Sequence, residues 1–290
     1  MPQKLEKLLD QLVKLHPKFI DLSLNRLLLL LDKLGNPHLN LPATIHIAGT
    51  NGKGTTVHLI ESFLIKRGLN VGVYTSPHLR KYNERVTFNK RSLEDHCFLE
   101  SFEKIAKQRG GIQLTYFEYG TLAAFLSLNE LPCDAWVIEV GLGGRLDATN
   151  ILNPSVSVIT NIAFDHQEWL GETLEEIARE KAGIIAANTP SIFADSQVPK
   201  SIEQTAFEKK SDLHLLDRDF FWSSNCESSE WRGKDAVINS IMTPSDWAEG
   251  ESSDLAAALM AIEIVDPSLL PTTKELNHIL KDFSVSGRFE

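Results

Sequence analysis

The sequence feature that most constrains this chain is a glycine-rich turn, which reads Gly49-Thr50-Asn51-Gly52-Lys53-Gly54-Thr55. A strand-forming run at 44–48 precedes the turn, and a helical pattern at 55–67 follows it. In a turn of this kind, backbone N–H groups can surround phosphate oxygens, and the helix N-terminus adds partial positive charge. Lys53 supplies a mobile cation beside them. The segment therefore predicts a phosphate-binding loop.

The turn departs from the common phosphate-loop spacing GxxxxGK[ST]. Residue 47 is Ile, and Gly54 intervenes between Lys53 and Thr55. A loop in which the glycines serve only to turn the chain is the alternative interpretation. That alternative does not explain a lysine and two threonines at the start of the helix, so we expect phosphate binding.

Strand and helix patterns alternate along most of the chain. Further strands are predicted at 71–75, 135–140 and 156–160, and further helices at 93–108, 117–128, 174–186 and 254–265. Alternation of this kind predicts an α/β fold with a mostly parallel, doubly wound sheet and helices on both faces. Two helical patterns, the second over 22–34, predict a helical N-terminal segment. Residues 199–247 are polar and irregular, and no strand can be placed there.

The composition excludes several classes of protein. The chain has 290 residues and a formal net charge of -10, and nucleic-acid-binding proteins normally cluster basic residues instead. Three separated cysteines, Cys97, Cys133 and Cys226, indicate neither a disulfide framework nor a zinc site. The aliphatic run at 27–31 is too short to span a membrane, and the N-terminus has no secretory signal pattern. We expect a cytoplasmic monomer with no nucleic-acid or membrane partner.

Six motifs in a fixed order indicate a more specific assignment. They are the glycine-rich turn, YTSPHL at 74–79, NERV at 83–86, TYFEYGT at 115–121, EVGLGGRLDATN at 139–150, and DH at 165–166 followed by REKAGI at 179–184. Together they resemble the folate-extending members of the Mur ligase superfamily, the bifunctional dihydrofolate synthase/folylpolyglutamate synthases. The extra glycine after the lysine of the turn is part of this resemblance.

The resemblance implies an ATP-dependent, ADP-forming ligase. It implies that ATP phosphorylates the carboxylate of dihydropteroate, or of a folate's terminal glutamate, and that the amine of L-glutamate then attacks the acyl phosphate. A monofunctional folylpolyglutamate synthase would share most of the motifs. A peptidoglycan-precursor ligase, with a UDP-linked substrate, is a third alternative.

The resemblance also implies two Mg²⁺ ions. It assigns Ser76 and Glu139 to the first ion, which prefers hard oxygen ligands, and His166 and Lys181 to the second. Lys53, His166 and Lys181 are the implied catalytic residues. Because an ammonium cannot bind a cation, the resemblance implies a carbamylated Lys181, which requires an amine with a lowered pKa. The structural alternatives are a turn residue at Ser76, a buried acid at Glu139 and a surface lysine at Lys181.

Substrate contacts are implied for two segments. Leu146-Asp147-Ala148-Thr149 should lie against the pterin, and residues 20–26 should help to cover it. Ser23 stands where the family usually has glycine, which makes the pterin contact of residues 20–26 less secure. Phe117 and Glu118 are either the core and cap of their helix or further substrate contacts.

Two departures from the family pattern limit the resemblance. Asp254 stands at the adenine-contacting position usually held by Asn, and an ionised Asp can only accept hydrogen bonds, so adenine recognition should be weaker. Arg288 should contact ATP. We expect the family's C-terminal glutamate ligase domain to be absent, with a helical segment at 1–40 and an ATP-binding domain at 41–290. A truncated, inactive nucleotide-binding or pterin-binding fragment is therefore the alternative function.

Overall fold

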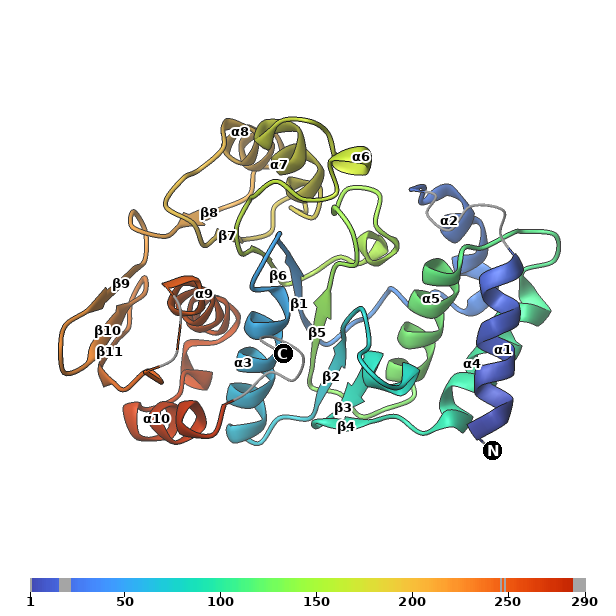
Figure 1. Cartoon of the computed structure of the whole chain (residues 1–290), viewed down its shortest axis with the longest axis horizontal. Helices are drawn as coiled ribbons and strands as arrows, with labels where there is room; N and C mark the ends of the chain where they lie inside the picture. Colours follow the sequence, from blue (N-terminus) through green and yellow to red (C-terminus); the bar gives the residue numbers. More distant parts are fainter. Residues whose placement is uncertain (1, 16–21, 246, 248, 284–290) are drawn as a thin grey trace.

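A mostly parallel sheet forms the centre of the protein (Figure 1). The computed structural model describes residues 2–15, 22–245, 247 and 249–283. Its strands are β1 (Ala43–Ala48), β2 (Val71–Tyr74), β3 (Val86–Phe88), β4 (Arg91–Ser92), β5 (Ala135–Glu139), β6 (Val156–Ile159), β7 (Ser191–Phe193) and β8 (Leu213–Leu215). Their spatial order is β4-β3-β2-β5-β1-β6-β7-β8, and only the pairs that involve β3 are antiparallel.

Helices cover both faces of this sheet. They are α1 (Pro2–Leu15), α2 (Asn25–Leu31), α3 (Lys53–Lys66), α4 (Asp95–Gln108), α5 (Tyr116–Asn129), α6 (Gln167–Leu170), α7 (Leu174–Ala182), α8 (Lys200–Lys209), α9 (Glu249–Val265) and α10 (Thr273–Lys281). Short 3-10 helices span Asp32–Leu34, Tyr82–Arg85, Ala148–Ile151 and Pro267–Leu269. Figure 1 shows α3 and α9 side by side on one side of the sheet and α4 and α5 on the other.

Alternate residues of each central strand face different hydrophobic cores. Ile45 and Ile47 of β1 pack with the apolar side chains of α3, α9 and α10. Trp136 and Ile138 of β5 pack instead with those of α4 and α5, while Ile159 of β6 packs with α7 and α8. This alternation follows from the period of two in a strand, and it confirms the predicted doubly wound α/β fold.

A second, smaller sheet packs against α9. It consists of the antiparallel strands β9 (Phe221–Ser224), β10 (Ser229–Arg232) and β11 (Val237–Ile241). Trp231 donates its indole N–H to the carbonyl of Ala256 in α9 at 3.2 Å. The buried carboxylate of Glu263, also in α9, accepts three consecutive backbone N–H groups from the β10–β11 turn. The segment 199–247, for which no strand was predicted, therefore contains three strands that form a sheet on α9.

The N-terminal helices pack on the same core as α4 and α5. Leu5 and Leu12 of α1 and Leu27 and Leu30 of α2 are buried in that core. The predicted helix at 22–34 begins at Asn25 and ends in a 3-10 turn. None of the helices within the described residues has the length and hydrophobicity needed to cross a membrane.

Candidate active site

The predicted phosphate loop lies between the end of β1 and the start of α3. Gly52 has φ 80°, a left-handed conformation that glycine adopts without strain. A Cβ at Gly49 would lie 1.8 Å from the hydroxyl of Thr160, so only glycine fits there. Lys53 donates its ammonium to the carbonyls of Gly49 and Thr50 at 3.0 and 3.1 Å, which folds its side chain back over the loop. Lys53 therefore helps to hold the backbone of the loop in its turn.

Two residues at the end of β6 hold this loop in place. Thr160 donates its hydroxyl to the carbonyl of Asn51. The backbone carbonyl of Asn161 accepts from the N–H of Thr50 at 3.1 Å, and its side-chain Oδ1 accepts from the N–H of Asn51 at 3.0 Å. Neither Thr160 nor Asn161 was predicted as a site residue, although Thr160 ends and Asn161 follows a predicted strand at the edge where such sheets bind ligands.

The two residues assigned to the first metal ion meet at the same edge. Ser76 follows β2, Glu139 ends β5, and these strands are parallel neighbours. The N–H of Ser76 donates to a carboxylate oxygen of Glu139 at 3.0 Å. Glu139 is only 4% exposed. A hydroxyl and a carboxylate are suitable ligands for a hard divalent cation, which usually completes its shell with water and substrate phosphates. Within the described residues, no three His, Cys, Asp or Glu side chains converge as a metal cluster.

Lys181 reaches the phosphate loop from α7. Its ammonium donates to the carbonyl of Gly49 at 2.8 Å, and the residue is only 3% exposed. Burial and, to a smaller extent, the nearby charge of Lys53 lower the pKa of Lys181 to about 7, with Asp165 partly opposing them. The surface-lysine alternative is therefore wrong. The burial of Lys181 thus favours the neutral form of its amine.

His166 occupies a more open position. It has φ 47°, lies directly before α6, and its side chain is 53% exposed. Its Nε2 lies 3.6 Å from a carboxylate oxygen of Asp165. Asp165 also interacts electrostatically with Lys181, so the two predicted ligands of the second ion share one charged neighbour.

Two of the six motifs interlock through close backbone contacts. The N–H of Arg145 donates to the carbonyl of Glu180 at 2.7 Å, and the two side chains form an ion pair. Asn150 donates its amide to the carbonyls of both Arg145 and Gly183. A Cβ at Gly183 would lie 2.3 Å from the Cα of Arg145. This contact fixes the end of α7 and thereby the position of Lys181.

The segment predicted to contact the pterin is mostly buried. Asp147, Ala148 and Thr149 are at most 4% exposed, whereas Leu146 is half-buried. One carboxylate oxygen of Asp147 accepts from the N–H and hydroxyl of Thr149 at 2.9 and 2.6 Å, and the other accepts from the N–H of Leu142 at 2.9 Å. Burial raises the pKa of Asp147. The side chain of Asp147 thus holds the backbone of this segment in place through hydrogen bonds.

Phe117 and Glu118 lie beside this segment at the start of α5. Glu118 caps the helix by accepting from the N–H of Thr115 at 2.7 Å, which confirms the cap assignment. Its buried carboxylate also pairs with Arg26 at 3.0 Å, and so ties the N-terminal segment to the site. The ring of Phe117 lies where a Cβ of Gly141 would be, 2.4 Å from one ring atom.

The remaining predicted residues are the two further ATP contacts, Asp254 and Arg288, and the segment predicted to cover the pterin. Asp254 is 4% exposed, and a Cβ at Gly52 would lie 2.0 Å from its Oδ1, so its carboxylate rests against the phosphate loop. The side chain that was predicted to contact adenine is therefore directed at the phosphate loop. Arg288, together with residues 20 and 21 of the predicted covering segment, lies outside the described residues.

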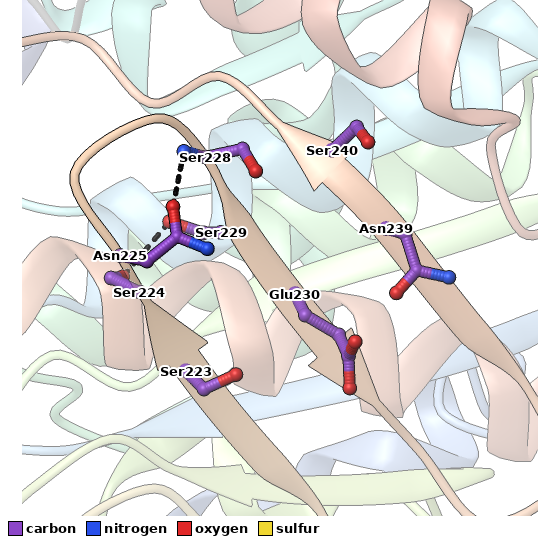
Figure 2. A pocket seen from close by; sticks show the side chains of 8 residues that line it. All are labelled: Ser223, Ser224, Asn225, Ser228, Ser229, Glu230, Asn239 and Ser240. Atoms are coloured by element: carbon purple, nitrogen blue, oxygen red, sulfur yellow. Dashed lines mark hydrogen bonds between the residues drawn. The ribbon is translucent and has the colours of Figure 1, made fainter.

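A separate hollow of about 460 Å³ lies on the small sheet (Figure 2). Its polar lining consists of Ser223, Ser224, Asn225, Ser228, Ser229, Glu230, Asn239 and Ser240. None of these belongs to the six motifs. Asn225 accepts from the N–H of Ser228 within its own turn at 2.9 Å. We therefore place the candidate active site at the phosphate loop, where the motifs converge.

Known proteins are similar to this chain along most of its length. The Mur ligase middle domain family matches residues 47–219. The dihydrofolate synthase/folylpolyglutamate synthase of Escherichia coli K12 is 44% identical over 230 residues, which make up 79% of this chain and 53% of that protein. This chain thus spans about half the length of that relative.

Two solved structures are similar in both sequence and arrangement. Escherichia coli FolC in complex with DHPP and ADP is 37% identical, with a TM-score of 0.89 over 99% of this chain and 67% of that one. A bifunctional folylpolyglutamate synthase/dihydrofolate synthase with Mn, AMPPNP and L-glutamate bound is 36% identical. Its TM-score is 0.87 over 99% of this chain and 68% of that one.

Proposed function

Because this chain belongs to the Mur ligase family, we propose that it ligates L-glutamate to dihydropteroate and to folates with the use of ATP. The observation that carries the proposal is the approach of Lys181 to the carbonyl of Gly49 at 2.8 Å. It brings a buried amine with a lowered pKa to the phosphate loop, next to the edge where Ser76 and Glu139 meet. The relatives named above favour a pterin acid over a UDP-linked substrate.

The phosphate loop and Lys53 bind the nucleotide in this proposal. The N-terminus of α3 attracts the phosphates, and Lys53 moves its ammonium from the carbonyls of Gly49 and Thr50 onto them. A relative with Mn and AMPPNP bound supports ATP and a divalent cation as ligands. We assign Mg²⁺ as that cation, with Ser76 and Glu139 as ligands of a first ion. When bound, Mg²⁺ supplies positive charge to the transferring phosphoryl group.

Lys181 becomes a ligand for a second cation by carbamylation. Its neutral amine adds carbon dioxide, which forms one N–C bond, releases one proton and converts the side chain into an anion. The support is its burial together with a pKa of about 7. We place His166 on the same cation, with Asp165 orienting its imidazole. An NMR spectrum with isotope-labelled bicarbonate should show a carbamate carbon that disappears in Lys181→Met, and its absence from the parent protein would contradict this role.

The acceptor substrate lies against the segment that contains Leu146, in the same proposal. Its carboxylate attacks the γ-phosphorus of ATP, and ADP leaves. The amine of L-glutamate then attacks the acyl carbon, and phosphate leaves as the amide forms. We further propose that residues 41–290 act as one ATP-binding domain and that the chain is a cytoplasmic monomer. The shared core of β1, α3, α9 and α10 supports the single domain.

Incorporation of labelled glutamate tests the proposed reaction. The chain is incubated with ATP, Mg²⁺, dihydropteroate and labelled L-glutamate, and the product is separated by chromatography. We expect ATP-dependent product that Lys53→Met abolishes, whereas Lys66→Met, at the exposed end of the same helix, leaves it intact. Retained nucleotide binding without glutamate incorporation would instead identify a nucleotide-binding or pterin-binding protein.

A further inference from the structure

A buried histidine next to the candidate site has no role in the proposed reaction. His46 belongs to β1, three residues before Gly49, and none of its surface is exposed. Its Nε2 lies 2.9 Å from the hydroxyl oxygen of Thr149, which is also fully buried. Its other ring nitrogen, Nδ1, is buried and has no hydrogen-bond partner among the described residues.

The hydrogen bonds of Thr149 determine where the imidazole carries its proton. Thr149 has one hydroxyl proton, which it donates to Asp147 at 2.6 Å. Both carboxylate oxygens of Asp147 accept N–H groups, from Thr149 and from Leu142, as expected of an ionised carboxylate. The hydroxyl of Thr149 must therefore accept from His46, so Nε2 carries the proton and Nδ1 does not. Burial lowers the pKa of His46 to about 3, which keeps the ring neutral.

This chain of hydrogen bonds joins two parts of the candidate site. One end is β1, which leads directly into the phosphate loop. The other end is the segment 141–149, here named the acceptor segment, whose half-buried Leu146 is its proposed contact with the pterin acid. Asp147 holds both ends of the acceptor segment, through the N–H groups of Leu142 and Thr149.

We propose that His46, as the neutral Nε2–H tautomer, is a positioning residue that fixes the acceptor segment relative to the phosphate loop through Thr149 and Asp147. The pterin part of this inference rests on the proposed function. An apolar side chain would fill the same space without a buried nitrogen that lacks a partner. The donor on Nε2 is what an apolar side chain cannot supply.

Two substitutions at His46 distinguish the role of its hydrogen-bond donor from the role of its side-chain volume. Glutamine places an amide N–H near the position of Nε2, so His46→Gln keeps a donor for Thr149. His46→Met fills a similar volume without a donor. His214→Met is the matched control, since His214 is a largely buried histidine of β8 at the far edge of the same sheet.

The first measurements do not depend on any substrate. Nitrogen NMR of the parent protein should show His46 protonated at Nε2 only. Amide hydrogen exchange in His46→Met should show the N–H groups of Leu142 and Thr149 exchanging about tenfold faster, with the parent rates restored in His46→Gln. A proton on Nδ1, or unchanged exchange in His46→Met, would overturn the proposal.

The second measurement links the segment to the acceptor. Calorimetry should show His46→Met binding dihydropteroate about tenfold more weakly than the parent, while AMPPNP with Mn²⁺ binds within about twofold. An equal loss in His214→Met would reduce His46 to a packing role and overturn the inference. If the parent chain itself binds no dihydropteroate, the proposed function fails, and hydrogen exchange alone decides on His46. If His46→Met does not fold, Thr149→Val against Thr149→Ser makes the same comparison.

Discussion

Replacement of Lys181 by methionine should make the protein more stable while abolishing the proposed ligase activity. Methionine has a similar length and no charge, so Lys181→Met removes a buried amine whose pKa is lowered to about 7. The carbonyl of Gly49 loses one donor but keeps the ammonium of Lys53 at 3.0 Å. A buried cationic residue that costs stability is expected where a site requires it for chemistry.

The size of the effect follows from the pKa of Lys181. A decrease in pKa from 10.5 to about 7 means that the folded state disfavours the protonated amine by about 5 kcal/mol relative to the unfolded state. The lost hydrogen bond to Gly49 offsets about 2 kcal/mol of the gain, because a bond from a charged donor is stronger than a neutral one. We therefore expect Lys181→Met to raise the free energy of unfolding by about 2–4 kcal/mol near pH 6.

This gain should shrink as the pH rises. The unfolded chain keeps a proton on Lys181 up to about pH 10.5, whereas the folded chain releases it near pH 7. Between these values the unfolded state binds more protons, so the parent protein gains stability relative to Lys181→Met. The difference between the two proteins should fall by about 2–3 kcal/mol from pH 6 to pH 9.

Urea unfolding in buffers depleted of carbon dioxide measures both quantities, because the amine is then free of carbamate. Lys66→Met, an exposed lysine of α3, is the matched control and should change stability by no more than about 0.5 kcal/mol. A variant less stable than the parent at pH 6 would refute the reasoning. So would a difference that stays constant between pH 6 and pH 9.

Other predictions concern the loop and its supports. Gly49→Ala should weaken AMPPNP binding about 100-fold in calorimetry while the protein stays folded, because its Cβ would displace Thr160; unchanged affinity would contradict the close approach. Arg26→Ala should lower the free energy of unfolding in urea by about 1–3 kcal/mol, since it leaves the buried Glu118 with fewer partners, and no loss would contradict that. Glu263→Ala should cost about 2–4 kcal/mol in the same assay because three N–H groups lose their acceptor; a smaller cost than Arg26→Ala would contradict it.

Local patterns in the sequence predicted the centre of the fold well. The alternation of short apolar strands with helices gave β1, β2, β5 and β6 within about one residue of their ends, because buried strands are continuous apolar runs. The helix after the phosphate loop begins at Lys53 rather than Thr55, since the loop itself supplies the first turn. The six motifs predicted the family, which the match to the Mur ligase middle domain confirms.

Contacts between distant segments could not be predicted in the same way. Strands β9 and β11 expose polar side chains on a small sheet, so their alternation is weak, and no strand was predicted there. Thr160 and Asn161 hold the phosphate loop from more than a hundred residues away, which only the parallel pairing of β1 and β6 explains. The position of Asp254 against Gly52 likewise depends on how α9 packs on α3.

The fate of one oxygen atom tests the proposed acyl phosphate most directly. Dihydropteroate with a heavy-oxygen label in its carboxylate is incubated with the chain, ATP, Mg²⁺ and L-glutamate, and the released phosphate is analysed by mass spectrometry. The carboxylate oxygen that attacks phosphorus leaves with the phosphate when the amide forms. We predict one labelled oxygen in each phosphate, and only when all substrates are present. Phosphate released without label would contradict the proposed reaction.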